Sequence, residues 1–275
     1  RAEYWVGIFH LRGYVMEKNP AEAARWMRLA AEHGDINGMA RLGLWHLNGN
    51  LVSKDYQAAR KWLGMAADAG HVDAQLDLAH LQTRSDYPDP QDRDGLKRVK
   101  PLAEAGNANA MELYGLMCYY GRGAPASKSE SFLWYHKAAE AGRRYAQYWT
   151  GQCLHKGKGT KKDMAQAIEW YRKAARNGEY HAQLELGHCY ESGLGVPIDL
   201  IEAHKWFTLA GKTPSTNVGP LLENLQKKIN PEQIQESQRR VRLFEDGIDV
   251  KPGEQRQKEE ELDLKKLPFD PAGIT

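Results

Sequence analysis

Aromatic and small residues recur along this chain of 275 residues at an interval of 36 positions. Tryptophan gives the clearest series, with Arg98 in the one slot that lacks it. The series is Trp26, Trp62, Trp134, Trp170 and Trp206. Glycine follows the same period, with Ala79 in its open slot: Gly7, Gly43, Gly115, Gly151 and Gly187. Such an interval is typical of solenoid proteins, and it predicts six repeats between residue 1 and about residue 211.

Each repeat is predicted to contain two helices. The first helix of the fifth repeat, for example, is expected from Ala146 to about His155, before glycines that suit a left-handed helix end. The second helices begin at a slot that holds Asn19, Asp55, Gln91, Ser127, Asp163 and Asp199. Five of these six are good N-caps, because their side-chain oxygen accepts from a free backbone N–H. Three residues later, four side chains predict reciprocal capping boxes: Glu22, Glu130, Gln166 and Glu202.

The same period predicts how the helices pack. Glycines on the first helices, including Gly151, are expected to face a neighbouring helix and to let the backbones approach closely. The tryptophans are expected to fill the space between helix pairs and to join one repeat to the next. Burial of each ring is worth roughly 3 kcal/mol. A single pair cannot bury its apolar face, so the stability is expected to come from stacking.

The third repeat departs from this pattern. Residues 82–90 replace the glycine turn, and Pro101 falls within the expected second helix. Proline removes a helical hydrogen bond, so a kinked or delayed second helix, or a local hinge, is expected there.

The sixth repeat shows the full motif: Ala182, Leu186, Gly187, Tyr190, Gly193, Gly195, Asp199, Ala203 and Trp206. This motif resembles the Sel-one-like repeat (SLR) family, a relative of the tetratricopeptide repeats. The resemblance implies an all-α, right-handed α-solenoid of about six helix pairs. It also implies a scaffold or adaptor that binds other proteins, since members of the family serve bacterial envelope, secretion, motility, exopolysaccharide or signalling complexes.

Two capping helices and a tail are expected after residue 211. A helix is predicted from Gly219 to Ile229, and another after Asn230, where a proline and Gln233 complete a helix start. Residues 212–246 would then cap the solenoid through Ile234, Val241 and Phe244. Residues 247–275 are expected to form an extended or disordered tail, and the apolar segment 267–271 either docks on a groove of this or another molecule, or is frayed.

Tetratricopeptide relatives bind extended peptides along the concave face of their first helices. Carried over to this chain, that geometry gives a strip rich in tyrosine and histidine. The candidate binding residues are Tyr119, Tyr145, Tyr148, His155, His181 and His188, with Tyr4 and His80 in comparable positions. Aromatic side chains suit protein recognition, although some of these tyrosines could instead pack between helices.

Other chemistry has weaker support. A basic cluster comprises Arg143, Arg144, Lys156, Lys158, Lys161 and Lys162. It could meet an acidic partner or an anionic polymer, but it is interpreted as a solvated face. Cys118, Cys153 and Cys189 are interpreted as buried small residues, since no spacing matches a zinc motif. No metal or cofactor is therefore expected. Some cysteine-rich relatives are associated with β-lactam chemistry, but this chain lacks their paired cysteines.

Composition narrows the function further. A net charge of +2 argues against a nucleic-acid-binding protein, and no apolar run is long enough to span a membrane. No catalytic motif is present, so an enzyme is not expected. The alternatives are a structural subunit that assembles through the solenoid ends or the tail and, below it, a hydrolase acting on cell-wall material. A soluble protein of the cytoplasm or the bacterial periplasm or envelope is expected, and a start at Arg1 fits a removed leader or a segment of a longer chain.

Overall fold

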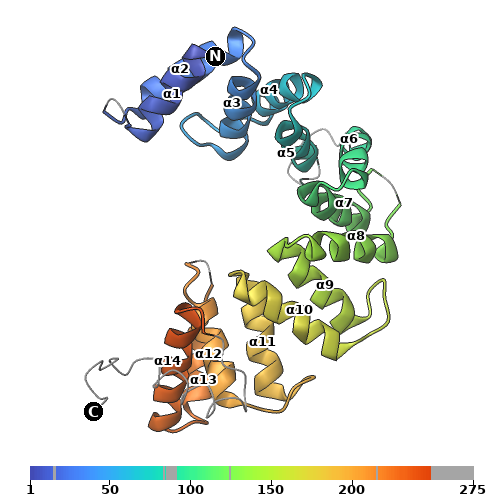
Figure 1. Cartoon of the computed structure of the whole chain (residues 1–275), viewed down its shortest axis with the longest axis vertical. Coiled ribbons are helices and arrows are strands. Elements are labelled where there is room, and N and C mark those ends of the chain that lie inside the picture. The colour runs from blue at the N-terminus through green and yellow to red at the C-terminus, as the bar shows by residue number, and fades with distance from the viewer. Residues whose placement is uncertain (15–16, 83, 85–91, 124, 215, 249–275) are drawn as a thin grey trace, which may run out of the picture. The chain divides into compact units, whose positions relative to one another are not determined.

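The computed structural model describes residues 1–14, 17–82, 84, 92–123, 125–214 and 216–248 (Figure 1). Within these ranges every regular element is an α-helix. In chain order they are α1 (Ala2–Arg12), α2 (Pro20–Glu32), α3 (Ile36–Asn48), α4 (Tyr56–Asp68), α5 (Val72–Gln82), α6 (Asp92–Glu104), α7 (Ala108–Tyr120), α8 (Lys128–Glu140), α9 (Arg144–Lys156), α10 (Met164–Arg176), α11 (Tyr180–Ser192), α12 (Leu200–Ala210), α13 (Gly219–Gln226) and α14 (Pro231–Glu245). The predicted N-cap Gln91, most of the altered turn at 82–90 and the tail beyond residue 248 lie outside the described residues.

The helices form two compact units. In the first, Arg1–Lys161, each helix from α1 to α9 packs on the next, and α5 also contacts α3 and α7. In the second, Lys162–Thr275, α10 packs on α11 and α11 on α12, which contacts both α13 and α14. This order of packing confirms the predicted all-α architecture of helix pairs.

The second helices begin where the N-cap pattern predicts. In five repeats the predicted cap side chain accepts from backbone N–H groups of the first turn, over N–O distances of 2.9–3.2 Å. The five caps are Asn19, Asp55, Ser127, Asp163 and Asp199. The N-cap prediction is therefore confirmed wherever the cap residue is described.

The reciprocal capping boxes predicted for these helices were wrong. The residues proposed to close them were Glu22, Glu130, Gln166 and Glu202. The N–H group of Ser127 donates instead to the Cys118 carbonyl oxygen at 2.9 Å, and the N–H groups of Asn19 and Asp199 donate likewise to the preceding helix. The Gln166 amide donates to the Asp163 carboxylate. The N-cap N–H group that a capping box requires thus forms a hydrogen bond with the first helix of the same repeat instead.

Glycines on the first helices admit a large residue from the second. A Cβ atom added at Gly43 would lie 2.8 Å from Leu63 Cγ and 2.9 Å from Leu63 N. At Gly115 it would lie 3.2 Å from Tyr135 Cγ, and at Gly187 it would overlap the Phe207 ring. Leu63, Tyr135 and Phe207 each come directly after the tryptophan position of their repeat. The residue that follows the tryptophan position is 0–1% exposed in every repeat. That position holds Met27, Leu63, Val99, Tyr135, Tyr171 and Phe207.

The tryptophans differ in burial from repeat to repeat. Trp134, Trp170 and Trp206 are buried, whereas Trp26 and Trp62 are only half-buried. The Trp134 ring meets Tyr114 of its own repeat edge-on, with 5.1 Å between ring centroids. The residue after each tryptophan, rather than the tryptophan itself, is therefore the constant core position, and the joining of repeats by tryptophan stays a prediction.

The third repeat keeps its helix pair. Helix α6 begins at Asp92, in register with the other second helices, so the predicted delay was wrong. Pro101 lies inside α6, and its carbonyl oxygen still accepts from Ala105 N–H at 2.9 Å. The first helix of this repeat has Ala79 in the glycine slot, and a Cβ atom added at Gly95 of α6 would lie 3.0 Å from Gln82 Oε1 and 3.4 Å from Ala79. Small residues on both helices thus preserve the close approach of this pair.

Helix α14 covers one side of α12. Asn230 and Gln233 form the predicted capping box at its start. Phe244 meets Trp206 edge-on, with 5.2 Å between ring centroids, and Val241 is buried. The shorter α13 ends at Gln226, three residues before the predicted end.

Charged groups are buried beneath α14. Lys205, at 1% exposure, pairs with Glu202, at 2%. Arg240 of α14 lies 3.0 Å from Glu202 Oε2 and 3.3 Å from Asp199 Oδ2. The equivalent positions of the other repeats, such as Lys61 and Glu169, are exposed. Lys205 is buried at this position. Docking of α14 therefore changes the environment of this slot.

Candidate functional site

A groove of about 690 Å³ lies along the first helices of the first unit, and we refer to it as the unit-1 groove. It is lined by Leu44 of α3, Asp73, Leu76, Asp77 and His80 of α5, Asn109, Glu112, Leu113 and Leu116 of α7, Tyr135 of α8, and Arg143 and Tyr145 at the start of α9. These helices follow one another in the first unit (Figure 1). The groove is thus built from corresponding faces of successive repeats.

The lining positions follow the helical period within each helix and the 36-residue period between helices. Asp73, Leu76, Asp77 and His80 are separated by three or four residues, so they share one face of α5. The lining residues of α7 occupy the same slots one repeat later, and Tyr145 occupies the first slot of α9. The groove therefore lies on the first helices, and that this face binds a partner stays a prediction.

Leucines line the groove together with a buried polar group that has no partner in the described structure, the hydroxyl of Tyr135. Tyr135 is 1% exposed, and its hydroxyl group has no hydrogen-bond partner in the described structure. Burial, with a smaller contribution from nearby groups such as Tyr145 and Glu112, raises the Tyr135 pKa well above its usual value. Its hydroxyl is therefore a proton donor at neutral pH. A buried hydroxyl without a partner costs about 1–3 kcal/mol, which a ligand could recover.

The basic end of the groove is already neutralised. Arg143 Nη2 donates to Glu112 Oε1 at 2.9 Å, and Ala146 N–H donates to Glu112 Oε2 at 3.1 Å. Arg143 is thus paired with Glu112 while its side chain stays 42% exposed, and the interpretation of the basic cluster as a solvated face stays a prediction. Its Nε atom is buried without a partner in the described structure, so it offers a second donor close to Tyr135.

The α5 end of the groove carries unpaired acid. Burial, reinforced by Asp73, raises the pKa of Asp77 to about 6, although His71 opposes this shift. Burial and the nearby Arg84 lower the pKa of His80, which is therefore neutral at pH 7. Sequence reasoning missed both aspartates. The signal was present, because Asp73 lies two periods before Tyr145.

Trp149 is the centre of an aromatic cluster at α9, and sequence reasoning missed it. It stacks on Tyr135 at 5.7 Å between ring centroids and contacts Tyr119 at 5.3 Å. Tyr145 and Tyr148 lie 6.1 and 5.8 Å from it. The predicted residues Tyr119, Tyr145 and Tyr148 are thus brought together, although only Tyr145 lines the groove itself. Trp149 occupies the slot of Asp77 and Leu113, which would have identified it.

The other predicted residues are separately placed. His155 is half-buried on α9. In the second unit, His181 Nδ1 lies 2.7 Å from Glu179 Oε1, and the exposed His188 meets Phe207 edge-on. His181 and His188 occupy the slots of Asp73 and His80 in their own repeat, so they extend the same face pattern within the second unit.

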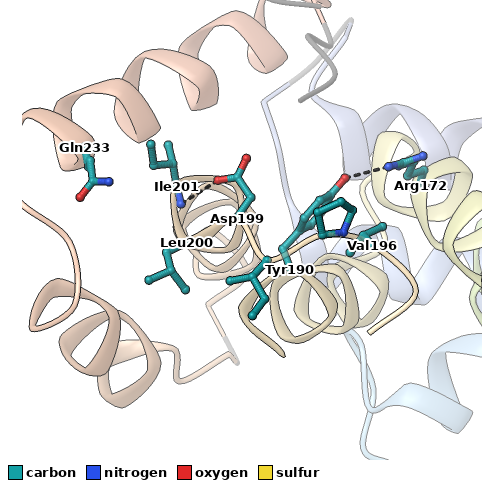
Figure 2. A pocket seen from close by; sticks show the side chains of 9 residues that line it. Arg172, Tyr190, Val196, Asp199, Leu200, Ile201 and Gln233 are labelled. Carbon is teal, nitrogen blue, oxygen red and sulfur yellow. Dashed lines mark hydrogen bonds between the residues drawn. The ribbon is translucent and has the colours of Figure 1, made fainter. Parts of the chain in front are cut away.

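A second cavity of about 480 Å³ lies in the second unit (Figure 2). Arg172 donates to the Tyr190 hydroxyl at 2.8 Å, and Asp199 caps α12 through Ile201 N–H. Gln233, on α14, belongs to the capping box. The polar groups that line this cavity already have partners, so it is the weaker binding candidate.

The described residues offer little else for chemistry. All three cysteines are free and buried, as predicted, and burial raises their pKa values to about 11 or 12. Within the described ranges, no three histidine, cysteine or acidic side chains gather in a metal-binding group. No described helix has the length and apolar character needed to cross a bilayer.

Comparison with known proteins identifies the repeats. A family model described as Sel1 repeat matches residues 1–35, 36–71, 108–142, 144–179 and 181–212, and leaves out the irregular third repeat. A Sel1 repeat protein of Oxalobacter formigenes is 28% identical over 76% of this chain and 84% of its own, with a TM-score of 0.70. No curated protein matches.

Two further bacterial structures are similar. A protective antigen of uropathogenic Escherichia coli strains, which displays an SLR fold, is 26% identical with a TM-score of 0.51, over 100% of this chain and 65% of that one. An immunity protein of Pseudomonas aeruginosa shares only the fold, at 19% identity and a TM-score of 0.51, over 84% of this chain and 87% of its own. Sel1 repeat proteins are generally protein-interaction scaffolds. With five repeats matched along most of its length, the chain belongs to the Sel1 repeat family.

Proposed function

We propose that this protein is an adaptor that binds an extended segment of a partner protein in the unit-1 groove. The unpaired hydroxyl group of Tyr135, buried in a groove lined by leucines, carries this proposal. An extended segment presents both backbone carbonyl groups and side chains, so it could accept from Tyr135 while it covers the leucines. The similarity to bacterial Sel1 repeat proteins supports a bacterial adaptor.

The composition of the groove suits protein recognition. A volume of about 690 Å³ lies within the usual range of ligand sites, roughly 300–1,000 Å³, and accommodates several side chains. Apolar lining residues exclude water, while a few polar groups fix the orientation of the ligand. Within the second unit, His181 and His188 occupy the corresponding slots and are proposed as recognition residues of that unit.

Site-specific photocrosslinking tests this proposal. A photoreactive amino acid replaces Tyr145, which lines the groove, or Tyr120, which is 57% exposed on α7 and does not line it. The full-length proteins are expressed in the source cells, and crosslinked peptides are identified by mass spectrometry. One partner segment should crosslink at Tyr145 and not at Tyr120.

The matched alanine variants complete the test. Tyr145→Ala combined with Tyr148→Ala should lose that partner without a change in melting temperature, whereas Tyr120→Ala should retain it. If the partner crosslinks only at Tyr120, or survives the double substitution at full strength, the groove is not its binding site.

A hydrolase acting on cell-wall material has one observation in its favour. The raised pKa of Asp77 is a property expected of a general acid in a cleft. Purified peptidoglycan incubated with the protein should release soluble fragments if this function is real, and Asp77→Asn should abolish the release. Equal release by both proteins, or none by either, removes the hydrolase from consideration.

The structural-subunit alternative gains no comparable support. Helix α14 already covers one side of α12, so that side is not open for another subunit. Docking of residues 267–271 concerns residues outside the described structure.

A further inference from the structure

The unit-1 groove changes chemical character from one end to the other. Its first slot holds Asp73 on α5, Asn109 on α7 and Tyr145 on α9. A second slot changes from Asp77 to Leu113 and then to Trp149, which stacks on the groove residue Tyr135 without lining the groove itself. The α5 end is thus acidic and the α9 end aromatic, although the backbone geometry of the repeats is the same. A partner that fits this groove must match both ends.

The unpaired charge of the groove is negative. Glu112 and Arg143 neutralise each other at 2.9 Å, and His80 is neutral because its pKa is lowered. Neither Asp73 nor Asp77 forms a salt bridge within the described residues. Two carboxylates therefore stand at the α5 end without a lysine or arginine partner among the described residues, although the nearby His71 lowers the pKa of Asp77 in part.

The negative charge of Asp73 and Asp77 favours a ligand that carries a positive charge. Asp77 is half-buried beside a like charge, an arrangement that is unfavourable unless an opposite charge approaches. The described residues around it do not form a group suited to a metal ion, so the cation is expected on a side chain. Lysine and arginine have stems long enough to lie along the leucines while their charged ends reach the carboxylates.

We propose, building on the function proposed above, that the unit-1 groove selects a partner segment with a lysine or arginine at Asp73 and Asp77 and an apolar or aromatic side chain toward Tyr145. The buried hydroxyl group of Tyr135 donates to the segment between these two anchors. Adjacent helices pack at about 8–10 Å, so α5 and α9 are separated by roughly 20 Å, or about six residues of extended chain. The partner motif is therefore a cation and an apolar anchor about six residues apart.

Selection from a peptide library tests the proposal. A displayed library of random dodecapeptides is panned on the full-length protein, and an enriched peptide is synthesised with a fluorescent label. Its Kd is measured by anisotropy for the wild type, for Tyr145→Ala and for Asp73→Asn combined with Asp77→Asn. Glu32→Gln combined with Glu140→Gln is the control, because it removes two exposed acids outside the groove.

The expected result is enrichment of lysine or arginine about six residues from an apolar residue. The Asp73 and Asp77 variant should weaken binding at least tenfold, Tyr145→Ala should also weaken it, and the control should stay within twofold. Melting temperatures establish that the variants remain folded.

The other outcomes separate the two proposals. Peptides that depend on Tyr145 but show no preference for a cation, or bind the Asp73 and Asp77 variant normally, overturn the cationic motif and leave the adaptor function standing. Peptides that need neither Tyr145 nor the aspartates, or no enrichment at all, overturn both proposals.

Discussion

The two faces of each first helix in the first unit obey different rules. On the packed face, Gly43 approaches Leu63 closely, and Gly115, two repeats later, approaches Tyr135 in the same way. On the groove face, corresponding slots hold acids at α5 and aromatics at α9. Packing imposes one steric requirement on every repeat, whereas a groove slot meets only solvent or a partner. A position that keeps the same kind of residue in every repeat therefore indicates a packing requirement. A position whose residue type changes between repeats indicates binding specificity.

The largest loss of stability is expected at Glu202, which is buried although the equivalent residue two repeats earlier is exposed. Glu202→Ala removes the carboxylate that pairs with the buried Lys205 and Arg240. Both cations then lack a main partner in the protein interior, so unfolding should become easier by about 3–5 kcal/mol. Chemical denaturation of the full-length protein, followed by circular dichroism, measures this loss.

Glu130→Ala is the matched control, because Glu130 occupies the same slot two repeats earlier and is exposed. It should change the unfolding free energy by about 0.5 kcal/mol or less. Equal losses for the two variants would mean that α14 does not create a distinct environment for this slot.

The next effect compares a packed glycine with an unpacked one in the neighbouring helix. Gly43→Ala places a methyl group against the Leu63 backbone and side chain, so the interface must open, at a cost of roughly 1–3 kcal/mol. Gly64→Ala, in the adjacent helix α4, meets nothing within 4 Å and should stabilise the helix by up to about 1 kcal/mol. Thermal denaturation should therefore shift in opposite directions for the two variants, and a shift in the same direction would refute the close approach.

These packing rules explain why the fold was predictable. The caps Asn19 and Ser127 and the glycine series satisfy local or nearest-neighbour requirements, which recur with the period and are visible in the sequence. The capping boxes failed because the N–H group of Ser127 bonds to Cys118, a contact between helices that no local pattern reveals. Burial of Lys205 depends on α14, which follows the repeats and does not share their period.

The candidate site was only partly predictable. Tyr145 was found because it is aromatic. Asp73 and Asp77 were missed because charged residues are common on solvent-exposed helix faces. Their significance appears only when the slots of α5, α7 and α9 are placed side by side. Tyr135 could not be predicted as a groove residue, because it belongs to the second helix α8 and reaches the groove past α7.

A smaller effect is expected when the groove loses its acid. Asp77→Asn removes a half-buried carboxylate that carries a free-energy cost at neutral pH, so the protein should gain on the order of 1 kcal/mol after allowance for solvent screening. His71 and Asp73 act on this carboxylate, and His80, Glu112 and Arg143 also line the groove. The variant should thus be more stable while binding cationic peptides less well.

The pH dependence of that gain follows from the raised pKa. The folded carboxyl group keeps its proton up to about pH 6, whereas in the unfolded chain it ionises near its model value of 3.8. Unfolding of the wild type therefore becomes easier as pH rises through this window, and the difference from Asp77→Asn should appear above pH 6 and vanish below pH 4. A constant difference at all pH values would assign the gain to something other than this carboxylate.

The smallest effect concerns a single hydroxyl group. Tyr135→Phe removes a buried donor that has no partner in the described structure, so the unfolding free energy should stay level or rise by up to about 1 kcal/mol. Tyr114→Phe instead removes a hydroxyl that donates to Glu130 at 3.4 Å and should lower it by about 0.5 kcal/mol. The first variant should nevertheless bind groove peptides more weakly, since the ligand then loses its donor. A Tyr135→Phe protein that is clearly less stable than the wild type would show that the hydroxyl serves the fold, because removal of a donor without a partner should not destabilise the free protein.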